Sequence, residues 1–148
     1  MRQLQNGKRI KERFRENRNE IVEVFEETEG VELAYVFGSM VEGEVGRLSD
    51  IDFGIYLREE ENFIEKKLEL RRKLSVLVGE DMDIVVMNTS NRLLNYNIIS
   101  GGELLYEKLQ QKKVEVETDI MRKYLDRRYH DKRHTEKRLE RFVEKGLK

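Results

Sequence analysis

The sequence contains no cysteine and no tryptophan, and only two of its 148 residues are histidine. Without cysteine, the chain can form neither a disulfide nor a thiolate metal site. It also lacks the GxxxxGK[ST] motif and any Ser-His-Asp set, which disfavours P-loop phosphate handling and acyl transfer. No apolar run approaches the length that spans a bilayer and no signal peptide is recognisable, so we expect a soluble, cytoplasmic protein.

Charged residues are unusually abundant, at 40% of the chain against about 25% in typical soluble domains. The excess is Lys, Arg and Glu, which is typical of thermophilic proteins and predicts a high melting temperature. The net charge of −1 hides an uneven distribution, because residues 1–18 carry +5, residues 122–148 carry +6 and the remainder carries −12. The basic ends could contact RNA or an acidic protein. Because we recognise no aromatic platform on which bases could stack, we favour solvated helices over specific nucleic-acid binding.

Two short segments have the pattern of β-strands. The first, Val31 to Phe37, is rich in β-branched and aromatic residues and lies between two glycines, which predicts a buried strand. The second, Asp50 to Leu57, alternates strictly, so that Ile51 and the apolar residues after it share one face. Asp50 and Asp52 then stand side by side on the opposite face. Paired carboxylates of this kind suit Mg²⁺ or Mn²⁺.

A possible phosphate site lies between these strands, at Gly38 and Ser39. Ser39 and Glu42 fit a capping box, which predicts the start of a short helix. The exposed amides of such a helix start attract anions, and Gly38 lets the backbone approach a phosphate closely. Gly-Ser alone is usually only a turn and a cap, and Asp-x-Asp alone is equally weak. Their combination, separated by ten residues and flanked by strands, favours a site for a metal and a nucleotide.

Helices are predicted in the remaining segments. Phe14, Ile21 and Phe25, with Ile10, form one apolar stripe that Gly30 ends, and Phe63, Leu70, Leu74 and Leu77 form another that Gly79 ends. From Lys108 the chain reads as helical to its end, with Val114, Ile120, Met121, Tyr124 and Leu125 as its clearest apolar residues. A chain of 148 residues has the length of one domain. We divide it into a core, residues 1–107, and a C-terminal helical arm, residues 108–148. The arm's apolar face is sparse, so it either belongs to the same domain or packs on a partner.

The run GSMVEGEVGRLSDIDFGIYL resembles the minimal (MNT-type) members of the nucleotidyltransferase superfamily, and the resemblance extends from Val31 to Glu107. It implies the polymerase beta-like α+β fold, a small mixed β-sheet with helices packed on it. It also implies a third carboxylate on a later strand. Asp83, directly before an Ile-Val-Val run, matches that position better than Asp81, which falls in the turn after Gly79.

The same resemblance implies an activity and a partner. Asp50, Asp52 and Asp83 would be catalytic residues that hold two Mg²⁺ ions, while Gly38 and Ser39 would bind the phosphates of ATP. The reaction would transfer AMP to a hydroxyl, a tyrosine by analogy, of a HEPN ribonuclease toxin, so that the chain acts as an antitoxin. One alternative is an antitoxin that neutralises by contact alone. Another is nucleotide transfer to a small molecule or an RNA end.

One residue departs from the family pattern, and a few others match the spacing of unrelated motifs. Glu42 stands where many relatives carry a basic residue, and Arg47 in the same loop could supply the missing charge. Arg128 and His134 match the spacing of a HEPN ribonuclease motif, but such spacing arises easily in a basic helix. His130 and His134 lie four residues apart without an evident third ligand, so we interpret them as solvated.

Overall fold

The computed structural model describes residues 12–38 and 51–126 of the chain. The regular elements follow one another as α2 (Arg18–Glu27), β1 (Val31–Phe37), β2 (Ile51–Leu57), α4 (Phe63–Val78), β3 (Met82–Val86), α5 (Arg92–Gly101) and β4 (Glu103–Glu107). Residues 110–126 are also helical and are called the C-terminal helix below. Both predicted strands are present, and the predicted helix ends at Gly30 and Gly79 are confirmed in the turns after α2 and α4.

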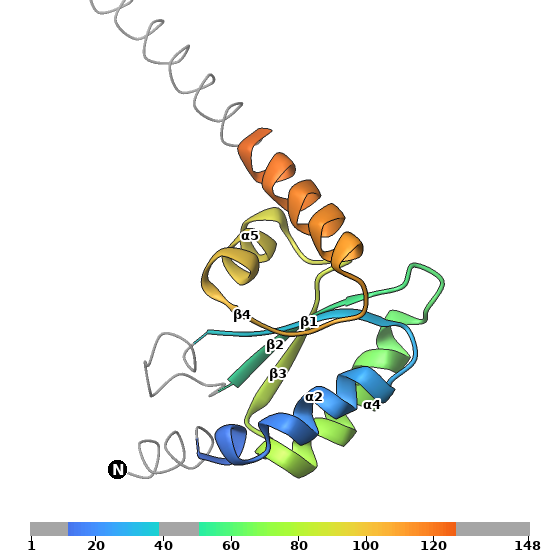
Figure 1. Cartoon of the computed structure of the whole chain (residues 1–148), viewed down its shortest axis with the longest axis vertical. Helices are drawn as coiled ribbons and strands as arrows, with labels where there is room; N and C mark the ends of the chain where they lie inside the picture. Colours follow the sequence, from blue (N-terminus) through green and yellow to red (C-terminus); the bar gives the residue numbers. More distant parts are fainter. Residues whose placement is uncertain (1–11, 39–50, 127–148) are drawn as a thin grey trace, which may run out of the picture.

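The strands form one mixed sheet in the order β3-β2-β1-β4 (Figure 1). β1 is antiparallel to β2 and to β4, whereas β2 is parallel to β3. A parallel pair needs a crossover connection, and α4 provides it. The predicted α+β class, with helices packed on a small mixed sheet, is therefore confirmed.

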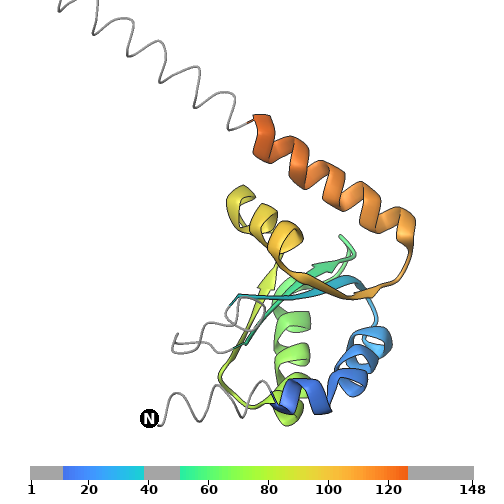
Figure 2. The same ribbon diagram turned by 60° about the vertical axis from the view of Figure 1, so that its left-hand side comes forward.

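One face of the sheet is covered by α2 and α4 (Figures 1 and 2). The alternation of β2 is as predicted, since its four apolar residues, from Ile51 to Leu57, are fully buried on this side. Phe25 of α2 meets Phe53 edge to face, with ring centroids 5.7 Å apart. This face is a continuous apolar core, and it also buries Phe14, Ile21, Leu70 and Leu74.

The opposite face carries α5 and the C-terminal helix (Figure 2). Val116 and Ile120 of the C-terminal helix are buried there, and Tyr124 stacks on Tyr96 of α5 with ring centroids 3.8 Å apart. The phenol of Tyr35 in β1 donates a hydrogen bond of 2.6 Å to Glu117. Residues 110–126 of the arm thus pack on the sheet of the same chain. Glu117 takes part in this packing, although a glutamate in a charged helix would be expected to face solvent.

Val114, Met121 and Leu125 do not take part in this packing, although the sequence marks them among the arm's clearest apolar residues. Their exposed fractions are 55%, 48% and 56%. The inner face of the helix instead uses Val116, which stands between two glutamates in the sequence. Residues 110–126 thus pack on the sheet of the core, and binding of a partner by the arm stays a prediction. Within the part of the chain that the structure describes, no helix is long and apolar enough to cross a bilayer.

Candidate active site

Asp52 and Asp83 are brought together by the pairing of β2 with β3. In this parallel pair the two aspartates are direct partners. Their strand neighbours, such as Ile51 and Ile84, point into the core under α2 and α4, so alternation places both carboxylates on the opposite face. Neighbouring strands lie about 4.8 Å apart. Two acids at this spacing repel each other unless a cation or a proton lies between them.

Gly38 lies directly beside Asp52. Phe37, the last residue of β1, pairs with Asp52 across the antiparallel ladder, and Gly38 follows with a φ of +84°. A Cβ atom at this position would lie only 2.5 Å from the Oδ2 atom of Asp52. Both the backbone angle and the contact therefore require glycine. The end of β1 and the Asp52 carboxylate form one compact unit, as expected if the backbone here approaches a charged ligand closely.

Within residues 12–38 and 51–126, two groups contact the carboxylate of Asp83, both at Oδ1. The amide of Ile84 donates a hydrogen bond of 2.8 Å to it, and Nη1 of Arg71 in α4 lies 3.9 Å away. Arg71 also donates to the carbonyl of Met82 at 3.1 Å, so it is anchored beside the start of β3. The ion pair is about half exposed and is screened by water. Arg71 could not be singled out from the sequence, because it looks like one of several surface cations on a charged helix.

The other predicted site residues fall outside the described part of the chain. Ser39 and Asp50 both lie in the segment 39–50, as do Glu42, Arg47 and the predicted helix start. The structure therefore brings together Gly38, Asp52 and Asp83, and the roles of all five predicted residues remain predictions. Asp81, the rejected alternative for the third acid, lies in the turn before β3 and is exposed.

The described acids could supply only part of the ligand set of a metal ion. Residues 12–38 and 51–126 contain no cluster of three or more His, Cys, Asp or Glu side chains that could hold one. They do contain the pair Asp52 and Asp83, and the sequence places Asp50 two positions before Asp52. Carboxylate oxygens are the donors that Mg²⁺ prefers, and it needs only one or two of them when phosphate oxygens complete its shell. The donor set fits a magnesium nucleotide.

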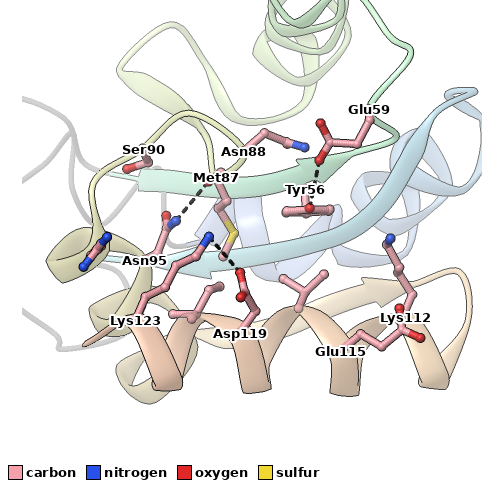
Figure 3. A pocket seen from close by; sticks show the side chains of 13 residues that line it. Tyr56, Glu59, Met87, Asn88, Ser90, Asn95, Lys112, Glu115, Asp119 and Lys123 are labelled. Atoms are coloured by element: carbon pink, nitrogen blue, oxygen red, sulfur yellow. Dashed lines mark hydrogen bonds and ion pairs between the residues drawn. The ribbon is translucent and has the colours of Figure 1, made fainter. Parts of the chain in front are cut away.

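A cavity of about 430 Å³ lies on the same sheet face, at the other end of β2 (Figure 3). Its residues come from the ends of β2 and β3, from α5 and from the C-terminal helix, and they include Tyr56, Met87, Asn95, Lys112, Asp119 and Lys123. Between this cavity and Asp52, α5 packs directly on β2, since a Cβ at Gly54 would lie 3.1 Å from Ile98. The acid pair and the cavity are therefore separate features of one face, and nothing in the sequence indicated the cavity.

Tyr56, at the edge of this cavity, is held in its neutral form. Burial raises the pKa of Tyr56 to about 12, and its hydrogen bond of 3.2 Å to Glu59 acts in the same direction. Asn95 is buried, and its amide donates a hydrogen bond of 2.9 Å to the carbonyl of Met87. Lys123 pairs with Asp119 at 2.9 Å. The Oδ1 atom of Asn95, by contrast, is buried and has no hydrogen-bond partner among the described residues.

Comparison with known proteins agrees with this geometry. The family model described as polymerase beta, nucleotidyltransferase matches residues 19–111. The protein adenylyltransferase MntA of Shewanella oneidensis is 28% identical over 91 residues, which cover 61% of this chain and 65% of MntA. The match thus spans slightly less than two thirds of that relative's length.

Solved structures share the fold. A chain from a crystal structure of a toxin-antitoxin complex with AMP-PNP superposes with a TM-score of 0.64 at 24% identity, covering 77% of this chain and 91% of that one. A chain from the complex of the tri-AMPylated Shewanella oneidensis HEPN toxin with its MNT antitoxin gives 0.62 at 20% identity, covering 78% and 90%. Because the family model matches more than half of the chain, the chain belongs to the polymerase beta nucleotidyltransferase family.

Proposed function

We propose that this protein is a magnesium-dependent nucleotidyltransferase that moves AMP from ATP to a hydroxyl of a HEPN-type toxin and thereby acts as its antitoxin. One observation carries the proposal: Asp52 and Asp83 are paired across neighbouring strands, directly beside a glycine whose replacement would collide with Asp52. An isolated acidic pair could be a solvated strand end. The close approach of the Gly38 backbone is what indicates a site for a phosphate ligand and its cation.

The reaction forms one bond and breaks one. The acceptor oxygen attacks the α-phosphorus of ATP, the bond from that phosphorus to the bridging oxygen breaks, and pyrophosphate leaves. Asp50, Asp52 and Asp83 would hold divalent ions, which supply charge neutralisation for the phosphates when bound. In our proposal Asp83 accepts or orients the acceptor's proton, and the amides after Gly38, with Ser39, bind the departing phosphates.

The acceptor is inferred from relatives and from the size of the domain. MntA is a protein adenylyltransferase, and one structurally similar complex contains an AMPylated HEPN toxin. Here Asp83 is about half exposed at the start of β3, and Asp52 beside it in β2 is partly buried. Such a site suits an acceptor presented by another protein. A tyrosine of the toxin is the acceptor that we propose, because the added negative group would block access of RNA to the toxin.

The test is a mass measurement on the toxin encoded beside this gene. After incubation with this chain, ATP and Mg²⁺, the toxin should gain the mass of AMP, and EDTA should prevent the gain. The matched control is Asp50→Ala with Asp52→Ala, which should remain folded and leave the toxin unmodified. A toxin that is inhibited without any mass change would contradict the enzymatic proposal and favour neutralisation by contact alone.

A further inference from the structure

The cavity beside Tyr56 has the size and the partly apolar wall of a site for a small molecule. Its volume is about 430 Å³, and pockets that bind small molecules measure about 300–1,000 Å³. Met87, Val116 and Ile120 line it and are buried. The residues around it come from the ends of β2 and β3, from α5 and from the C-terminal helix (Figure 3). A ligand in this cavity would therefore contact four separate elements at once.

Asn95 of α5 offers the cavity a buried hydrogen-bond acceptor. Its side chain lines the cavity and is only 9% exposed. Its Nδ2 atom donates a hydrogen bond of 2.9 Å to the carbonyl of Met87, which fixes the orientation of the amide (Figure 3). Its Oδ1 atom has no hydrogen-bond partner within residues 12–38 and 51–126. Because buried polar atoms nearly always have a partner, this oxygen indicates a ligand that donates an N–H or O–H group.

The side chains near Asn95 suit a ligand with a flat ring. Aromatic rings pack well against the sulfur of methionine and against other aromatic rings, and both Met87 and Tyr56 line the cavity. The hydroxyl of Tyr56 already donates to Glu59 at 3.2 Å, so this residue offers the ligand its ring and not its hydrogen. A heterocycle that carries an amino group combines such a ring with the donor that Asn95 requires.

The charges around the cavity favour a neutral ligand. Three acidic and three basic residues line it, namely Glu59, Glu115, Asp119, Arg92, Lys112 and Lys123. Two of the bases are already paired. Lys123 lies 2.9 Å from Asp119, and Lys112 lies 3.5 Å from Glu32, which is outside the lining. With Glu32 included, four acids stand against three bases and the net charge is −1. This environment repels a triphosphate, so the cavity is not suited to a second molecule of magnesium ATP.

We propose that the cavity binds a neutral, amino-substituted heterocycle of the class to which adenine and cytosine belong, either as the free base or as its nucleoside. An N–H group of the ligand donates to Oδ1 of Asn95, and the ring packs on the apolar wall. The proposal is independent of the activity proposed above, because α5 packs on β2 between the cavity and the acid pair. The ligand ties the C-terminal helix to α5 and to the ends of β2 and β3, so it should stabilise the packing of this helix.

The experiment compares two probes that differ by one amino group. Calorimetry measures the binding of adenosine and of purine riboside, which is adenosine without the amino group, to the full chain in EDTA and without ATP. We expect adenosine to bind at least about tenfold more tightly, because purine riboside leaves Oδ1 of Asn95 without a donor. Adenine is measured in parallel, and the tighter of adenine and adenosine assigns the cavity to the free base or to the nucleoside.

Two variants test whether the probe lies in the cavity. Asn95→Leu removes the acceptor, and Ser90→Phe fills the cavity from the turn between β3 and α5, so each should weaken adenosine binding at least about tenfold. The matched controls are Asn97→Leu, at an exposed asparagine of the same helix, and Thr89→Phe, at the exposed neighbour of Ser90. Neither control residue lines the cavity, so both variants should bind within about twofold of the unmodified chain.

Folding and location are checked separately. Thermal unfolding followed by circular dichroism verifies that each variant is folded. If Asn95→Leu fails this check, because the carbonyl of Met87 has lost its donor, the comparison of Ser90→Phe with Thr89→Phe decides. Adenosine should also slow hydrogen exchange more in residues 110–126 than in α4.

Three results would overturn the proposal. The first is no binding of adenine or adenosine at about 1 mM, which would leave the cavity to water. The second is equal binding of adenosine and purine riboside. The third is unchanged binding of adenosine by Ser90→Phe, because the probe would then lie elsewhere on the protein. By contrast, binding in the cavity by a chain that transfers no AMP would contradict the proposed activity alone.

Discussion

The two faces of the sheet carry different kinds of side chains. The face under α2 and α4 is a continuous apolar core, whereas the face under α5 and the C-terminal helix mixes apolar contacts with Asp52, Asp83 and the Tyr35 to Glu117 hydrogen bond. Both faces are made by the same strands, since alternate residues serve each one. The face under α2 and α4 has the larger buried apolar cluster, so we expect it to contribute more to stability than the face that carries the polar groups.

The largest expected effect is on the apolar face. Leu74→Ala removes a fully buried side chain of α4 and should lower the free energy of unfolding by about 2–5 kcal/mol. Leu68→Ala, on the exposed side of the same helix, should change it by about 0.5 kcal/mol or less. Urea denaturation of both variants measures the difference. Equal effects would mean that Leu74 is not part of a packed core on this face.

Gly38→Ala tests whether the end of β1 supports both the stability of the fold and the position of the Asp52 carboxylate. The positive φ and the collision with Asp52 should cost about 1–3 kcal/mol of stability, and displacement of the carboxylate should greatly reduce AMP transfer. Gly101→Ala is the matched control, because a Cβ there meets no atom within 4 Å. Denaturation and transfer assays are run in parallel. A fully active Gly38→Ala variant would show that Asp52 need not lie where the structure places it.

Tyr35→Phe removes the hydrogen bond that ties the C-terminal helix to β1. The loss should cost about 1–2 kcal/mol, because Tyr35 is 2% exposed and its acceptor is a carboxylate, although Glu117 keeps its ion pair with Lys113. Hydrogen exchange should increase in residues 110–126 and stay unchanged in α4. Uniform acceleration across both helices would instead show that the two faces unfold as one unit.

Tyr35 and Tyr56 lie on the sheet face under α5 and the C-terminal helix, and they make the stability of the protein depend on pH. Burial, followed by the hydrogen bond to Glu117, raises the pKa of Tyr35 well above its usual value, and burial raises the pKa of Tyr56 to about 12. Both phenols therefore hold their protons more tightly in the folded state. Their contribution is complete below pH 10, and it is lost as the pH rises above 10, up to about 12 for Tyr56 and over a wider range for Tyr35. This alkaline loss of stability should be smaller in Tyr35→Phe.

The smallest expected effect is at Arg71. Arg71→Met should change stability by about 0.5 kcal/mol or less, because the ion pair to Asp83 is long and half exposed. It should lower the rate of transfer by about two- to fivefold, since Asp83 loses one of its two described contacts. Arg72→Met, at the next exposed arginine, is the control. Identical rates for the two variants would remove Arg71 from the site.

The apolar face could be predicted almost completely from the sequence. The alternation of β2 and the stripes of α2 and α4 follow from period-2 and period-3.6 patterns, which is why Ile51, Phe25 and Leu74 are buried as expected. The high melting temperature suggested by the composition stays a prediction.

The sheet face under α5 and the C-terminal helix was harder to predict, because polar residues take part in its packing. Glu117 reads as solvent-facing, yet it accepts the bond that anchors the helix. The pairing of Asp52 with Asp83 depends on the parallel register of β2 and β3, which no local pattern encodes, so Asp83 could be chosen only by resemblance. Arg71 and the cavity beside Tyr56 also arise from elements that are distant in the sequence.

We propose that the strand register makes Asp83, and not its neighbour Asp81, part of the active site with Asp52. The most direct test compares the rates of AMP transfer of Asp83→Asn and Asp81→Asn, two isosteric changes located two residues apart. We expect the first to fall by at least about a hundredfold and the second to stay within about twofold. Equal rates in both variants, or a larger loss in Asp81→Asn, would contradict the account.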